Sequence, residues 1–304
     1  MNPQPKVELA KSRDFSAIIS DTFLFIKENF KPLVTCFFVF CGFFMVATFV
    51  TLFMHQLNVL SLTNSISNNP NDYDSITSAS NVFGRIFDIQ FIIGIVFEMF
   101  YLIVMHIAIV SYMAIYKSKG NVAPTAAEVW SYVKYYFFRI TWSAIVLWLL
   151  VCIASVCCLI PGIWLYPIVA LMFPIMIIEN GSFSYAFNQA FRIIKENWWM
   201  TFGAIIISGI IAMIMASIVV MPISIFTVGN ILLHKSVTGV TSPGLATAQI
   251  GLGELARIFY IIPNVAVVLC YYSLNERKEG TGLMERIYQM GNTQNPTDLP
   301  TEEY

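Results

Sequence analysis

Charged residues are scarce in this sequence. Only 12% of its 304 residues are Asp, Glu, Lys or Arg, against about a quarter in soluble globular proteins, while 57% are hydrophobic. The formal net charge is −1, so no excess of positive charge indicates a nucleic-acid partner. Several apolar runs reach the ~20 residues that an α-helix needs to cross a bilayer. The composition therefore indicates an integral membrane protein and excludes a soluble enzyme carrying a single anchor.

Residue types that support metal or nucleophilic catalysis are also few. The chain has three histidines, and it contains no HExxH, GxSxG or Walker phosphate-binding pattern. Its six cysteines all lie in apolar runs, which indicates packing rather than disulfides or a metal-binding CxxC pair. We therefore expect no cofactor, no bound metal and no enzymatic activity.

Hydropathy predicts six membrane-spanning helices. They lie near residues 33–54, 89–116, 140–160, 163–178, 199–228 and 251–274. Fourteen of the 17 Lys and Arg residues lie in one set of flanking segments and three in the other, and the positive-inside rule makes the first set cytoplasmic. The expected protein is an all-α, multi-pass protein of the bacterial cytoplasmic (inner) membrane, with its N- and C-termini in the cytoplasm.

A short sequence recurs before three of the spans. Residues 23–30 (FLFIKENF) match residues 191–198 (FRIIKENW), and residues 130–137 (WSYVKYYF) are a weaker copy. Around each copy the apolar residues recur at steps of three and four, which predicts an amphipathic helix. With basic flanks, such helices are expected in the plane of the lipid headgroups. The predicted membrane-interface residues are Phe15, Ile19, Phe23, Ile26, Trp130, Phe187, Phe191, Ile194 and Trp198.

The recurrence predicts a domain organisation of three repeated units. Each unit is an in-plane helix followed by a helical hairpin, and the units cover approximately residues 14–116, 121–178 and 182–275. We expect residues 1–13 to be an N-terminal cytoplasmic tail and residues 14–290 to be the six-span membrane domain. The polar residues 291–304 are expected to be a disordered C-terminal tail.

Two places in the predicted spans carry ionisable residues, which are costly inside a membrane unless they are paired. Glu98 lies near the middle of the second span, and His106 lies eight residues further along the same helix. They form a candidate intramembrane polar site, either two stations of a proton or cation path or a buried carboxyl bonded to a neighbouring span. Glu254 and Arg257 are three residues apart and form a candidate interfacial ion pair.

Four stretches together carry a resemblance to a known family. They are residues 159–164 (LIPGIW), 173–179 (FPIMIIE), 190–195 (AFRIIK) with the following 198–199 (WW), and 271–280 (YYSLNERKEG). The chain resembles, over most of residues 10–290, the membrane domain associated with some bacterial glycerophosphoryl diester phosphodiesterases and related multi-span proteins. In those enzymes catalysis belongs to a separate soluble TIM-barrel domain, and this chain has no soluble segment long enough for one. The resemblance therefore implies a membrane fold but no phosphodiesterase activity.

Two functional hypotheses remain. The first is a non-enzymatic membrane protein that interacts with membrane lipids or acts as a scaffold for a protein partner or a second copy of itself. The alternative is a small-solute or proton-coupled transporter or channel that uses Glu98. The three aromatic amphipathic segments and the lack of a catalytic constellation favour the first.

Overall fold

The computed structural model describes residues 7–68, 84, 87–157, 159–234 and 243–280. These residues form helices and connecting turns, and no strand occurs among them. In chain order the helices are α1 (Phe15–Glu28), α2 (Phe30–Asn68), α5 (Ile89–Ser118), α6 (Ala126–Cys157), α7 (Leu159–Ile178), α8 (Phe183–Ile194), α9 (Trp198–His234), α10 (Pro243–Ala256), the 3-10 helix η2 (Arg257–Tyr260) and α11 (Ile261–Glu279).

Six helical stretches of the described chain are long and apolar enough to cross a membrane. They are Phe30–Ser61, Ile89–Ser118, Ala126–Val156, Ile160–Ile178, Trp198–Gly229 and Gly244–Glu279. The last stretch joins α10, η2 and α11. This confirms the predicted fold class, an all-α protein with six helices of membrane-spanning length.

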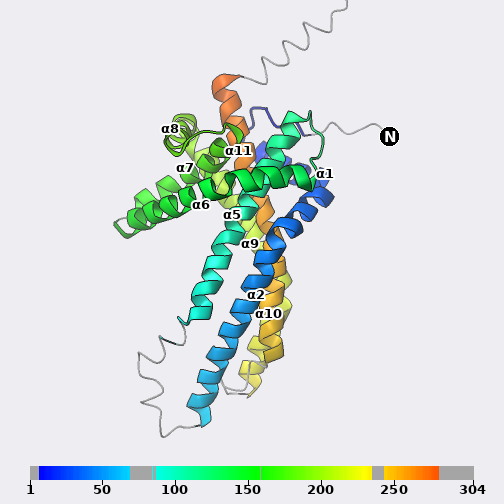
Figure 1. The fold of residues 1–304 in the computed structure, drawn as a ribbon, viewed down its shortest axis with the longest axis vertical. Helices are drawn as coiled ribbons and strands as arrows, with labels where there is room; N and C mark the ends of the chain where they lie inside the picture. Colours follow the sequence, from blue (N-terminus) through cyan, green and yellow to red (C-terminus); the bar gives the residue numbers. More distant parts are fainter. Residues whose placement is uncertain (1–6, 69–83, 85–86, 158, 235–242, 281–304) are drawn as a thin grey trace, which may run out of the picture.

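The six helices do not all run in the same direction. Figure 1 shows α2, α5, α9 and α10 along the long axis of the molecule, whereas α6 and α7 form a hairpin that crosses them near the end carrying α1 and α8. The first half of α6 is held there by ring stacking, with Trp130 on Phe40 of α2 and Phe137 on Phe100 of α5. The later part of α6 leaves these contacts, and Trp142 is 71% exposed.

Separate short helices precede two of the three hairpins. α1 ends just before α2 and α8 ends just before α9, at the places where the repeated sequence predicts amphipathic helices. At the third place the expectation is corrected, because α6 runs unbroken from Ala126 and includes the predicted in-plane helix. The other two copies carry Asn29 and Asn197 as their seventh residue, a residue type that competes for backbone hydrogen bonds. Residues 130–139 contain no Asn, Gly or Pro.

The segment expected as an N-terminal tail is packed onto the helices from Val7 onward. Val7, Leu9 and Ala10 are buried, and Arg13 is 2% exposed. Residues 7–13 of the predicted N-terminal cytoplasmic tail therefore pack against the helices, and the cytoplasmic location of this segment stays a prediction. The predicted disordered tail at residues 291–304 and the predicted end of the membrane domain at residues 281–290 lie outside the described residues.

The best-buried helices are the second half of α5 and the first half of α11. Four of their residues are fully buried, namely Ile107 and Val110 of α5 and Val265 and Leu269 of α11. Cys270 is also fully buried and is a free thiol. These two helices form the centre against which the polar residues of the candidate sites are positioned.

Candidate functional site

A cluster of three ionisable side chains lies where α5 meets the junction of α10 and α11. Arg257 of η2 forms an ion pair with Glu98 of α5, and its Nη2 lies 3.1 Å from Glu254 Oε1 at the end of α10. The guanidinium carbon of Arg257 also lies 5.4 Å from the centroid of the Tyr101 ring, within cation–π range. One guanidinium therefore stands between two carboxylates and an aromatic face.

The helix break at η2 positions Arg257. The Ile261 N–H donates to the Ile258 carbonyl in the 3-10 pattern and not to the Arg257 carbonyl four residues back. The Arg257 carbonyl is thereby left for the Tyr101 hydroxyl, which donates to it at 3.3 Å. The same break thus turns the Arg257 side chain towards α5 and ties its backbone there.

A cavity of about 480 Å³ opens beside this cluster. Glu98, Glu254 and Arg257 line one part of it, while the rest is formed mainly by apolar residues of α2, α9 and α10, including Met213 and Val220. The Glu254 side chain is 5% exposed and that of Arg257 is 19% exposed. The low exposure of Glu254 and Arg257 strengthens the electrostatic attraction between their side chains.

His106 lies in a different place from Glu98. Its Nδ1 is hydrogen-bonded to Asn264 Oδ1 of α11, and its ring centroid lies 5.1 Å from that of Phe173 on α7. A separate cavity of about 260 Å³ adjoins it, lined by Ile140 among others. The structure therefore does not bring Glu98 and His106 together in one cavity, although they occupy the same helix.

An apolar groove lies between α2, α5 and α6, and we call it the α2–α6 groove. Its volume is about 590 Å³. Lys134 is the one charged residue among those that line it, and Lys134 Nζ lies 5.8 Å from the Trp130 ring centroid. The groove is formed by Val39, Phe40, Phe43, Phe44, Val104, Trp130, Val133, Lys134, Phe137 and Phe138.

The residues predicted to face the membrane interface fall into two groups. In α1, Phe15 is 37% and Phe23 is 38% exposed, whereas Ile18 and Phe25 are fully buried. Those in α8 are better covered. Ile194 of α8 is buried, and Trp130 of α6 is exposed. The remaining predicted interface residues are half-buried, namely Ile19, Ile26, Phe187, Phe191 and Trp198.

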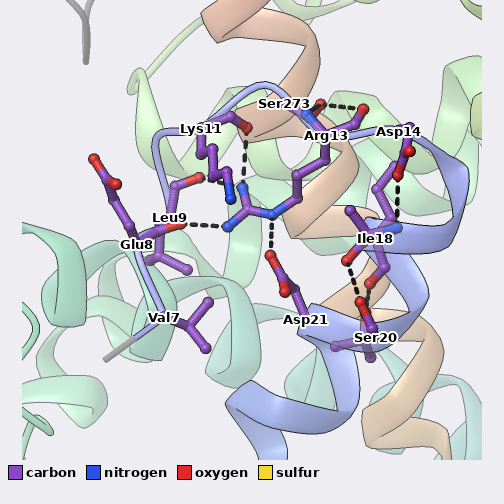
Figure 2. Close-up of polar contacts among 12 residues, drawn as sticks. Val7, Glu8, Leu9, Lys11, Arg13, Asp14, Ile18, Ser20, Asp21 and Ser273 are labelled. Atoms are coloured by element: carbon purple, nitrogen blue, oxygen red, sulfur yellow. Dashed lines mark hydrogen bonds and ion pairs between the residues drawn. The ribbon is translucent and has the colours of Figure 1, made fainter. Parts of the chain in front are cut away.

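Sequence reasoning missed a buried arginine that organises the chain ends. Figure 2 shows the Arg13 guanidinium enclosed by the segment before α1, with its Nε donating to Asp21 at 2.8 Å and its Nη1 donating to the Leu9 carbonyl at 2.7 Å. Its Nη2 donates to the Glu8 carbonyl. The Arg277 guanidinium in turn donates to the Arg13 carbonyl at 2.5 Å. As one basic residue among many, Arg13 gave no sequence signal of this role.

A second polar cluster that the sequence did not reveal surrounds Glu179, just after α7. Tyr271 of α11 and Tyr185 of α8 both donate their hydroxyls to it at 2.7 Å. The hydrogen bond to Glu179, followed by burial, raises the pKa of Tyr185 above its usual value. The cluster joins three helices, and it gives α8 a fixed position at the end of the bundle.

Asp88 caps the first turn of α5. Its carboxylate accepts the Phe91 N–H at 2.8 Å and the Asn58 Nδ2–H at 2.7 Å, and it lies 3.0 Å from His55 Nδ1. Burial opposes ionisation of Asp88, but these hydrogen bonds outweigh it and hold the pKa of Asp88 below its usual value. The cluster ties α2 to the start of α5.

Comparison with known proteins adds no assignment. No family model, curated protein or solved structure matches the chain. The class of protein that the fold defines is a multi-pass α-helical membrane protein, and any narrower function has to come from its cavities and charged clusters.

Proposed function

We propose that this multi-pass protein is a non-enzymatic, lipid-interacting protein of the bacterial inner membrane, with its chain ends in the cytoplasm, and that it holds a lipid in the α2–α6 groove. The groove carries the proposal. Its volume of about 590 Å³ lies within the ~300–1,000 Å³ typical of ligand pockets, and its walls are almost wholly apolar. An apolar wall in contact with the membrane suits an acyl chain.

Lys134 supports the choice of a lipid with an anionic headgroup. It lines the groove beside Trp130, and it belongs to the basic segment that the positive-inside rule assigns to the cytoplasmic surface. An ammonium group there attracts a phosphate oxygen while the aromatic walls hold the chain. Trp130 itself is suited to the boundary between headgroups and hydrocarbon.

The test is retention of lipid by the purified full-length protein, measured by native mass spectrometry from nanodiscs that contain phosphatidylglycerol. Val133→Trp should fill the groove and reduce the bound lipid at least tenfold, and Lys134→Glu should remove the preference for anionic over zwitterionic lipid. Ile214→Trp is the matched control, because Ile214 is 55% exposed on α9 and does not line the groove. Equal lipid retention by Val133→Trp and the control would contradict the proposal.

The charged cavity favours a second candidate, a small-solute or proton-coupled transporter that uses Glu98. Glu98 pairs with Arg257 beside a cavity, which is the setting in which intramembrane ionisable residues carry solutes or protons. The two-station path through His106 receives no support, because His106 borders another cavity. If the protein transports, Glu98→Gln should abolish flux in liposomes at unchanged folded yield, and unchanged flux would rule out this role for Glu98.

A further inference from the structure

We propose that the cavity beside Glu254 is a binding site for an alkylammonium group. The proposal concerns binding only, and it stands whether or not the α2–α6 groove holds lipid. Either a soluble alkylamine or the amino headgroup of phosphatidylethanolamine supplies this chemistry, since both present an ammonium group attached to an apolar body.

The balance of charge favours a cation when both carboxylates are ionised. Two carboxylates, Glu98 and Glu254, face the single guanidinium of Arg257. That guanidinium is already engaged. Its Nη1 pairs with Glu98, its Nη2 pairs with Glu254 Oε1, and its carbon lies over the Tyr101 ring. With both carboxylates ionised, the cluster retains one unit of negative charge in a poorly solvated place, which favours a cationic ligand.

Glu254 supplies the free acceptor. Its side chain is 5% exposed, and its Oε2 has no hydrogen-bond partner within the part of the chain that the structure describes. A buried carboxylate oxygen without a donor costs free energy, so a ligand that brings an N–H to it gains affinity. Glu254 lines the cavity, but its Oε2 is covered by neighbouring atoms, so the side chain has to turn towards the cavity before this oxygen can accept an N–H from a ligand.

The size and walls of the cavity favour an organic ammonium over a metal ion. Among the described residues there is no group of three or more His, Cys, Asp and Glu that could hold a metal. The volume of about 480 Å³ far exceeds the space that a bare ion needs, and Met213, Val220 and Ile250 give it apolar walls. Tyr260 also lines it and offers an aromatic face to a cation.

The test uses the full-length protein in nanodiscs of pure phosphatidylcholine, with hexylammonium as the probe and hexanol as its uncharged match. Calorimetric titration should show saturable binding of hexylammonium that is at least tenfold tighter than binding of hexanol. Glu254→Gln should weaken hexylammonium binding at least tenfold and leave hexanol unaffected. Glu128→Gln, a change at a 39% exposed carboxylate of α6, is the matched control and should bind as the wild type does.

Ala216→Trp is a second variant that tests the proposal even if Glu254→Gln does not fold. It fills the cavity from the α9 wall without altering the ion cluster. It should also abolish hexylammonium binding while the protein stays monodisperse with an unchanged helical signal. Repeating the titration in phosphatidylethanolamine nanodiscs separates the two sources. A headgroup ligand competes and weakens hexylammonium binding, whereas a soluble amine binds equally in both. Absence of saturable binding to wild type in phosphatidylcholine, or equal binding by wild type and Glu254→Gln, would overturn the proposal.

Discussion

Arg13 and Ser273 are joined by a reciprocal pair of hydrogen bonds although 260 residues separate them in the sequence. The Arg13 N–H donates to Ser273 Oγ at 2.9 Å, and the Ser273 hydroxyl donates to the Arg13 carbonyl at 3.2 Å. Ser273 is completely buried in α11. The segment before α1 is thus tied to the last helix, so the first and last described parts of the chain close the same end of the bundle (Figure 2).

Arg13→Ala should strongly destabilise the protein. The Arg13 side chain is 0% exposed, and its removal takes a donor from Asp21 and from the carbonyls of Leu9 and Lys11. Loss of one member of a buried charged network costs about 3–5 kcal/mol. The thermal midpoint of the purified protein in detergent, followed by cysteine-reactive dye or circular dichroism, should fall by several degrees.

Arg192→Ala is the matched control for that experiment. Arg192 also pairs with a carboxylate, Glu279 at 3.2 Å, but its side chain is 59% exposed. Ion pairs in water contribute about 0–1 kcal/mol, so its midpoint should remain close to that of the wild type. Equal losses in the two variants would show that Arg13 does not organise this end of the bundle.

Ser273→Ala should cause a smaller loss, of about 1–3 kcal/mol. The change removes one hydroxyl but leaves the Arg13 N–H and carbonyl in a buried place without that partner. Ser20→Ala serves as control, since the Ser20 hydroxyl is exposed and donates only to the Ala17 carbonyl of the preceding turn. A chemical-denaturation midpoint for Ser273→Ala that equals that of Ser20→Ala would contradict the expectation.

The fold could be predicted further from sequence than the site could. Hydropathy placed the second span at 89–116, and α5 covers Ile89–Ser118, because a continuous apolar run is a local signal. The crossing of α6 over α2 has no such signal. It depends on Trp130 stacking against Phe40, a contact between side chains of two separate helices.

The candidate site shows the same limit. The spacing of Glu254 and Arg257 pointed to their contact, because residues three apart share one side of a helix. The partner of Glu98 could not be predicted in this way. Arg257 is distant from Glu98 in the sequence, and it lies in the 3-10 helix η2, which packs against α5 only in the folded protein. The pairing of Glu98 with His106 followed from helix geometry alone, and packing against different neighbours separates them.

Asp88→Asn should change the pH dependence of stability while preserving the cap of α5, because the amide oxygen can still accept the Phe91 N–H. The pKa of Asp88 in the folded protein is below its usual value, so the unfolded chain takes up the proton first as the pH falls. The stabilisation by ionised Asp88 is therefore present above about pH 4 and is lost below it.

The thermal midpoints of wild type and Asp88→Asn, measured from pH 7 down to pH 3, test this expectation. The advantage of the wild type should be largest at neutral pH and should shrink below about pH 4. His55 lies 3.0 Å from the same carboxylate, so introducing His55→Gln into both proteins isolates the effect of Asp88 itself. A difference between the two proteins that stays constant over the whole range would show that Asp88 titrates as it does in the unfolded chain.

Arg257→Met should be among the most damaging single changes, because it leaves Glu98 and Glu254 facing each other without a cation. We expect a loss of about 3–5 kcal/mol, seen as a large fall in the thermal midpoint in detergent. Adding Glu254→Gln to Arg257→Met should recover part of that loss, since it removes one of the two unpaired charges, and such non-additivity is the mark of direct contact. Glu254→Gln added instead to Arg192→Met, at an exposed arginine that does not touch the cluster, should show no recovery. Simple addition of the effects of Arg257→Met and Glu254→Gln would mean that the three side chains do not act as one electrostatic unit.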